Sequence, residues 1–359
     1  MDRTTPLAAL HRENGARFGN DQEWTLPLQF GNVLDEYRAV RSGVGLIDLC
    51  RQTLLRFTGT DRVSFLQGMV SNDVARLSPG QGILAAFTDI QGKVIADIKI
   101  FGAGDSFFIE LGEPVKDKVL GHLAHYLIAD DVEIADLTGA YGILALLGPK
   151  STDLLRLLLG GQDLPAKALS HGEFQTDSHR IRVIRVPRPG AGYEVWAAAG
   201  ELAVLARWIQ ENGRVYGARW VGTEAQEILR VEAGIPRYGV DMDEENLLLE
   251  TGMDDAVSFN KGCYLGQEVI ERIHSRGHVN RKLTGLVLEG DEPAQRGDRI
   301  QAQDREVGKV TSAVFSPLLH CPIAMGYVQR DFLTPGTLLV VCRQASLIPS
   351  IVVSLPFKP

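Results

Sequence analysis

Hydrophobic positions in the first 140 residues follow the period of a strand in some stretches and of a helix in others. Asp61 can cap a helix over residues 61–72, whose apolar positions share one face. The other predicted elements are strands at residues 54–59, 83–87, 94–101, 106–111 and 132–137, and a helix within residues 115–127. This order of strand, helix, strands, helix and strand is typical of a split βαβ unit.

Residues 141–209 repeat the same order of elements. The predicted strands are residues 141–148, 180–187 and 192–197, and the predicted helices are residues 150–159 and 202–209. Split βαβ units form antiparallel sheets with helices on one face. The two halves share this pattern but no visible sequence identity.

The last part of the chain has a different pattern. A helix is predicted over residues 223–234, followed by a Gly-rich connection. From residue 281, helical periodicity gives way to short strands separated by Gly, Pro and Asp, which favours a small β-barrel or sandwich. The sequence therefore predicts an α+β protein with three domains: a first α+β domain with an N-terminal extension (1–140), a second α+β domain (141–280) and a C-terminal β-barrel (281–359).

Composition and charge narrow the class of protein. The 359 residues are 45% hydrophobic and 23% charged, which is typical of a folded globular chain. A formal net charge of -8 makes general nucleic-acid binding a poor interpretation, because such proteins need a basic surface. No segment has the apolar run of a membrane span or an export signal. We therefore expect a cytoplasmic protein without membrane or nucleic-acid partners.

The four cysteines are too sparse for a disulfide scaffold and are not spaced as ligands of an iron–sulfur cluster. Cys263 stands out because it lies in the stretch KGCYLGQE, at residues 261–268. Lys261 and backbone N–H groups freed by Gly262 and Gly266 could favour a thiolate. A passive buried cysteine is the alternative, and spacing alone leaves both open.

Further stretches suggest weaker sites. His274 and His278 have helical metal-site spacing, but Gly277 and the missing Glu argue against it, and we assign no metal. The stretch 271–282 carries Arg272, Arg276, Arg281 and Lys282, which either receive a carboxylate or phosphate tail or form a solvated turn. No complete GxGxxG or P-loop motif occurs, so nucleotide binding has no support.

Glu194 lies in GAGYEV, on a predicted strand between aromatic residues. A carboxylate in this position can accept two hydrogen bonds from an amidine-like ring edge, as it does from Arg. The alternative is a solvent-exposed Glu at a strand edge.

KGCYLGQEVIER resembles the motif of the YgfZ family of folate-binding proteins, which act in iron–sulfur protein maturation. Residues 24–49, 65–82 and 229–250 are similar to the framework of the glycine cleavage T-protein, a tetrahydrofolate-dependent aminomethyltransferase. The likeness covers nearly the whole chain. It implies two ferredoxin-like domains and a barrel around a central folate channel.

The resemblance also implies roles for single residues. Glu194 falls where the superfamily has the glutamate that grips the pterin ring, and Arg230 where an arginine contributes to the folate site. The T-protein has two adjacent aspartates where this chain has Ala96 and Asp97. It also has a Tyr-Thr-Gly run where this chain has Pro-Arg-Pro, at residues 187–189.

The resemblance thus implies a tetrahydrofolate-binding protein that supports assembly or repair of iron–sulfur proteins. Its functional residues are Cys263, Lys261 and Asp97, with Glu194, Arg230 and Asp97 at the folate. Folate and iron–sulfur client or assembly proteins are the expected partners. The alternative is an aminomethyltransferase or other one-carbon transferase that uses Asp97. Because the aspartate pair and the aromatic position are altered, we expect no glycine-cleavage activity.

Overall fold

The structure is a computed structural model and describes residues 3–21, 23–176, 179–186, 192–344 and 346–358. The chain forms two compact units. Unit 1 comprises Met1–Phe65, Val74–Ile83 and Ile98–Gln226, and unit 2 comprises Leu66–Asp73, Leu84–Asp97 and Glu227–Pro359. Several elements therefore run from one unit into the other.

Unit 1 contains a six-stranded sheet with the order β11-β12-β13-β10-β4-β14. In chain order its strands are β4 (Val44–Asp48), β10 (Tyr141–Leu147), β11 (His171–Gln175), β12 (Arg180–Arg185), β13 (Gly192–Ala198) and β14 (Ala218–Trp220). Every neighbouring pair is antiparallel except β14 and β4. Helices α5 (Ser151–Leu158) and α6 (Leu202–Gly213) pack on this sheet.

Alternation along β13 gives the two faces of this sheet different roles. Tyr193, Val195 and Ala197 belong to the core that contains the leucines of α5 and α6. Successive side chains of a strand point to opposite faces, so Glu194 and Trp196 lie on the other face. There Trp196 meets two phenylalanines of a second sheet.

The second sheet has the order β6-β7-β8-β5-β9. Its strands are β5 (Gln52–Thr58), β6 (Gly82–Thr88), β7 (Val94–Gly102), β8 (Phe107–Gly112) and β9 (Glu133–Asp136). The pairs β7–β8, β8–β5 and β5–β9 are antiparallel. Helices α3 (Arg62–Met69) and α4 (Lys116–Tyr126) follow β5 and β8 in the chain. Every strand and helix predicted for this part of the sequence is present.

The N-terminal segment forms elements that were not predicted from the sequence. They are β1 (Arg3–Thr4), α1 (Ala8–Glu13), β2 (Arg17–Asp21), β3 (Trp24–Gln29) and α2 (Val33–Ser42). The three strands form a small sheet of their own, with the order β1-β3-β2. In α2, Asn32 caps the helix by accepting hydrogen bonds from the N–H groups of Leu34 and Asp35.

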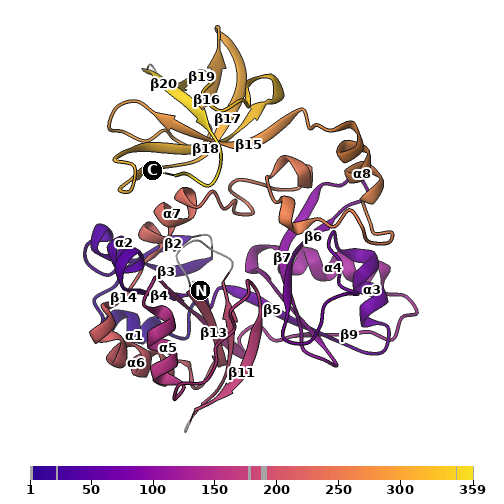
Figure 1. The fold of residues 1–359 in the computed structure, drawn as a ribbon, viewed down its shortest axis with the longest axis vertical. Coiled ribbons are helices and arrows are strands. Elements are labelled where there is room, and N and C mark those ends of the chain that lie inside the picture. The colour runs from indigo at the N-terminus through magenta and orange to yellow at the C-terminus, as the bar shows by residue number, and fades with distance from the viewer. Residues whose placement is uncertain (1–2, 22, 177–178, 187–191, 345, 359) are drawn as a thin grey trace. The chain divides into compact units, whose positions relative to one another are not determined.

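Unit 2 contains the predicted barrel, drawn in orange to yellow in Figure 1. It is closed, with the order β15-β18-β17-β16-β19-β20. The strands are β15 (Arg281–Leu288), β16 (Arg299–Ala302), β17 (Arg305–Ser316), β18 (Cys321–Gln329), β19 (Leu338–Arg343) and β20 (Ser346–Val353). Its interior is filled by aliphatic side chains, among them Leu286, Ile300 and Val341. The α+β class with a C-terminal barrel is confirmed.

The stretch of chain between β14 and the barrel holds α7 (Thr223–Glu232), 3-10 turns at Leu248–Glu250 and Asp254–Ala256, and α8 (Gln267–Arg276). Helix α7 was predicted and α8 was not. Glycines in the left-handed conformation bound α8, Gly266 with φ 84° and Gly277 with φ 79°. Because α8 ends before Gly277, His278 is outside the helix and does not share a helical face with His274.

One strand pairing crosses a predicted domain boundary. β4 precedes residue 140, yet it pairs with β10, which follows that boundary. The sequence Val44–Asp48 is short and contains a Gly, so it lacks the alternation that marked the other strands. Among the described residues, no helix is long and apolar enough to cross a membrane.

Candidate functional site

Glu194 lies in a cluster of three charged side chains in unit 1. Lys99 of β7 donates hydrogen bonds to Glu110 Oε1, at 2.8 Å, and to Glu194 Oε1, at 2.6 Å. Lys99 and Glu110 are direct partners in the β7–β8 register. Glu194 is 3% exposed, so it is not the solvent-exposed strand-edge residue of the alternative interpretation. Its position is fixed by Lys99.

Two carboxyl groups around one ammonium group leave an excess of negative charge in a buried place. Burial and the neighbouring Glu194 raise the pKa of Glu110 to about 8, against the opposing effect of Lys99. Burial alone would lower the pKa of Lys99, but Glu110 and Glu194 raise it. At neutral pH the cluster therefore holds a charged lysine and one extra proton on the carboxyl pair.

Aromatic rings surround this cluster. Trp196 lies on the same face of β13 as Glu194, and its ring meets Phe101 at 5.2 Å and Phe108 at 6.0 Å in edge-to-face geometry. The guanidinium of Arg182 lies over Phe108, 4.8 Å from its centroid. A carboxylate fixed among aromatic side chains is suited to a flat ring that carries N–H donors.

Lys261 forms hydrogen bonds at the C-terminal end of helix α3 and not with Cys263. Its ammonium donates to the carbonyl oxygens of Gln67, Val70 and Asn72 at 2.8, 2.5 and 2.9 Å. Carbonyl groups at the end of a helix have no partner within the helix, and the helix dipole favours a cation there. An ammonium has three N–H donors, and all three are used. The predicted role of Lys261 as an aid to the Cys263 thiolate finds no support in this geometry.

Burial also changes the pKa of Lys261. The side chain is 8% exposed. Burial lowers its pKa to about 8, with Asp73 opposing the shift. The ring of Tyr264 lies 4.7 Å from the ammonium. Lys261 is thus a buried anchor of the motif.

Further hydrogen bonds hold the ends of the motif loop, residues 256–266. The Ser71 hydroxyl donates to Ala256 O at 2.6 Å, and the Thr88 hydroxyl donates to Leu265 O at 2.7 Å. Between these anchors Cys263 is exposed and in the free thiol form, whereas Cys50, Cys321 and Cys342 are partly buried. The passive buried alternative for Cys263 is therefore wrong.

Arg230 has a full set of partners in unit 2. It donates to both carboxylate oxygens of Glu227, to Asp241 Oδ2, to Ile235 O and to Ser312 Oγ, at 2.6 to 3.0 Å. Burial alone would lower the pKa of Arg230, but the hydrogen bonds and charges of Glu227 and Asp241 raise it. A guanidinium has five N–H donors, so a folate group can reach Arg230 only by displacing one of these acceptors.

Asp97 lies on β7, next to Ala96, which occupies the position of the other aspartate of the T-protein pair. Ala96 is completely buried, whereas Asp97 is half-buried and lies on the opposite face of the strand. The carboxylate that this chain lacks therefore falls at a core position, and the one on the more accessible face is retained. Pro187, Arg188 and Pro189 lie outside the described residues.

Three members of the predicted basic cluster at residues 271–282 form ion pairs. Arg272 pairs with Glu268, Arg281 with Glu250, and Lys282 with Asp254. Sequence reasoning also missed the two residues that form the cluster with Glu194, namely Lys99 and Glu110. Their signal was present, since both are charged residues within strands that are mostly apolar.

Comparison with known families identifies the chain. The model of the GCVT N-terminal domain matches residues 7–261, and that of the glycine cleavage T-protein C-terminal barrel domain matches residues 281–358. Together these matches cover nearly all of the sequence. The chain belongs to the glycine cleavage T-protein family.

Individual relatives agree with this result. An aminomethyltransferase of Rubrobacter xylanophilus is 33% identical over 357 residues, which cover 99% of this chain and 94% of the relative. One of Halothermothrix orenii is 29% identical, with 98% of this chain and 99% of the relative covered. The crystal structure of glycine cleavage system aminomethyltransferase T from Bartonella henselae has a TM-score of 0.92 and 25% identity, covering 100% of this chain and 98% of that one.

The resemblance suggested two functions, iron–sulfur maturation and aminomethyl transfer, and these comparisons favour aminomethyl transfer. The wider superfamily is confirmed. The relatives and the crystal structure carry the name aminomethyltransferase, which favours the T-protein, and they give no support to the YgfZ type or to a role in iron–sulfur maturation.

Proposed function

We propose that the protein binds a reduced folate and acts as a tetrahydrofolate-dependent one-carbon transferase of the aminomethyltransferase type. The observation that carries the proposal is the buried Glu194 carboxylate, held by Lys99 among aromatic rings. A pterin ring presents adjacent N–H donors on one edge, and a fixed carboxylate accepts them as it accepts a guanidinium. Aminomethyltransferases use tetrahydrofolate as a substrate, which supports the same ligand.

Aminomethyl transfer is the reaction class that the relatives suggest. The methylene carbon leaves a carrier sulfur and an amine nitrogen and becomes bonded to two nitrogens of tetrahydrofolate. The two N–H protons of the folate go to the thiol and to ammonia. Asp97 is the group we assign to hold or move a proton at the folate nitrogen, because it is a half-buried carboxylate retained from the aspartate pair.

The retained Asp97 weakens the expectation, drawn from the sequence, that the protein has no glycine-cleavage activity. That expectation rested on the loss of a carboxylate at residue 96 and of an aromatic residue at 187. Ala96 is completely buried, so the lost carboxylate belongs to the core face of β7. Position 187 lies outside the described residues and carries no argument here. We therefore propose the transferase activity.

Binding of tetrahydrofolate, read by the fluorescence of the four tryptophans, tests the proposal, because one of them, Trp196, shares a strand face with Glu194. Glu194→Ala is expected to weaken binding by about 1–3 kcal/mol, the cost of leaving a polar ring edge unpaired. Glu211→Ala, on the exposed surface of α6, is the matched control and should bind as wild type does. Equal affinities of wild type and Glu194→Ala would remove Glu194 from the site.

A second candidate function is support of iron–sulfur proteins through Cys263. The observation in its favour is the exposure of this thiol on a loop anchored at both ends. Burial raises the pKa of Cys50 and of Cys321, which makes those thiols poorer nucleophiles. We expect limiting iodoacetamide to label Cys263 first, as read by peptide mass spectrometry.

The second part of this test is genetic. Cys263→Ser should keep tetrahydrofolate binding, because the change is small and lies on an exposed loop. If the second candidate holds, this variant fails to complement a strain deficient in iron–sulfur enzyme maintenance. Full complementation, or labelling of Cys263 no faster than Cys342, would remove this function.

A further inference from the structure

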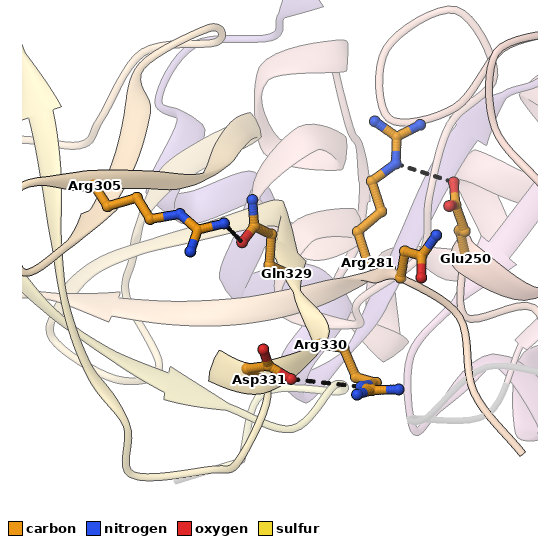
Figure 2. A pocket seen from close by; sticks show the side chains of 7 residues that line it. Glu250, Arg281, Arg305, Gln329, Arg330 and Asp331 are labelled. Carbon is orange, nitrogen blue, oxygen red and sulfur yellow. Dashed lines mark hydrogen bonds and ion pairs between the residues drawn. The ribbon is translucent and has the colours of Figure 1, made fainter.

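A pocket of about 570 Å³ lies at one end of the C-terminal barrel in unit 2. Figure 2 labels six of the side chains that line it, Glu250, Arg281, Arg305, Gln329, Arg330 and Asp331. The topology of the barrel explains why they meet. β15 begins at Arg281 and β17 begins at Arg305, and both strands run antiparallel to β18, which ends at Gln329. Two strand beginnings and one strand end therefore lie at the same rim.

The three arginines differ in how their charge is balanced. Arg281 Nε donates to Glu250 Oε2 at 3.1 Å, and its guanidinium lies over the ring of Tyr327. Among the described residues, the only carboxylate that forms an ion pair with Arg330 is that of the adjacent, exposed Asp331, at 3.5 Å. In the part of the chain that the structure describes, Arg305 has no carboxylate within ion-pair distance and donates only to the neutral Gln329, at 3.4 Å.

The pocket thus carries a net positive charge, although the protein as a whole is negatively charged. Three guanidinium groups face two carboxylates, while the chain as a whole has a formal net charge of -8. Bringing three like charges to one rim costs free energy unless an anion compensates them. Guanidinium groups present paired N–H donors that match the oxygens of carboxylate and phosphate groups.

We propose that this pocket binds a small polyanion that carries at least two oxyanion groups. Arg305 and Arg330 are its main contacts, because their charges are the least balanced, and the amide of Gln329 supplies a further hydrogen bond. Phosphates and carboxylates share the required chemistry. The proposal is independent of folate binding, since none of the residues assigned to the folate lines this pocket.

Calorimetric titration of the full chain at low ionic strength tests the proposal, with pyrophosphate and citrate as the two probes. At least one probe should bind, and the tighter one identifies the phosphate or the carboxylate class. Arg305→Gln and Arg330→Gln should each weaken binding about tenfold, since each removes a charge-assisted contact. Arg299→Gln is the matched control, because Arg299 is an exposed arginine on the same barrel outside the pocket.

Asp331→Asn gives a test of opposite sign. This change removes a competing carboxylate from the rim, so it should raise the affinity for the probe. Thermal unfolding of each variant confirms that the barrel is intact. Failure of both probes to bind at millimolar concentration would overturn the proposal, as would weaker binding by Asp331→Asn or an equal loss in Arg299→Gln.

Discussion

At the scale of single residues, the proton shared by Glu110 and Glu194 sets the charge of the carboxyl group that we assign to the pterin ring. Lys99 holds both carboxyl groups, yet a single ammonium cannot balance two carboxylates in a buried place. The raised pKa of Glu110 keeps one group neutral. The negative charge of the pair then resides on Glu194, which is the residue we assign to the pterin edge.

Glu110→Gln tests this protonation. Folded Glu110 keeps its proton up to a pH of about 8, whereas the unfolded chain releases it near its ordinary pKa of 4.5. The folded state therefore binds more protons between these values, and the free energy of unfolding falls as pH rises through this window. Relative to Glu110→Gln, wild type should lose on the order of 3 kcal/mol between pH 5 and pH 8. Urea unfolding at several pH values measures the difference, and parallel pH profiles would contradict the assignment.

Sequence reasoning found Glu194 but not what holds it. GYEV places a carboxylate on a strand between aromatic residues, but only the resemblance to the T-protein superfamily assigned it to the pterin ring. Lys99 is separated from Glu194 by 95 positions, and no local pattern indicates that their strands meet. The same holds for Lys261, whose proximity in sequence to Cys263 suggested a partnership. Its length and burial direct it instead to the end of α3.

At the scale of elements, the loop before α8 depends on one of its two glycines. Gly266 has φ 84°, and a Cβ there would lie 2.5 Å from Asp89 O and 2.7 Å from Thr88 Oγ1. Gly262 is exposed, and a Cβ there would meet nothing within 4 Å. The two glycines of one motif therefore serve different purposes.

This difference gives a matched pair of variants. Gly266→Ala should destabilise the fold by about 2 kcal/mol or more, because it combines a left-handed backbone with a clash against backbone atoms. Gly262→Ala should change the free energy of unfolding by less than about 0.5 kcal/mol. Denaturant unfolding of both variants checks this, and similar losses in the two would show that the loop geometry is different.

Elements with strong periodicity were predicted, and those defined by their neighbours were not. α5 and α6 carry leucines at helical spacing that pack into one core, so the pattern was sufficient. α8 has only three apolar residues and is bounded by glycines in the left-handed conformation, so its sequence resembles a loop. β4 contains a Gly and becomes a strand by pairing with β10 and β14.

At the scale of the whole molecule, the sequence indicated a folate-dependent superfamily, and the matched family models assign the chain to the T-protein family. The three domains predicted from periodicity stay a prediction, while the barrel strands do begin at Arg281. The motif KGCYLGQE favoured an iron–sulfur role because it resembles the motif of the YgfZ family. Similarity over the entire chain is a broader signal, and it supports a transferase.

The most direct test of the proposed function is a turnover assay. Purified protein, tetrahydrofolate and an aminomethyl-lipoyl carrier protein should yield ammonia and methylene-tetrahydrofolate in equal amounts, both absent without folate. Asp97→Asn should lower the rate by about a hundredfold or more, the usual contribution of a positioned acid or base, without loss of tetrahydrofolate binding. Ammonia release no faster than in the protein-free control, by a wild type that binds tetrahydrofolate, would contradict the assignment as a transferase.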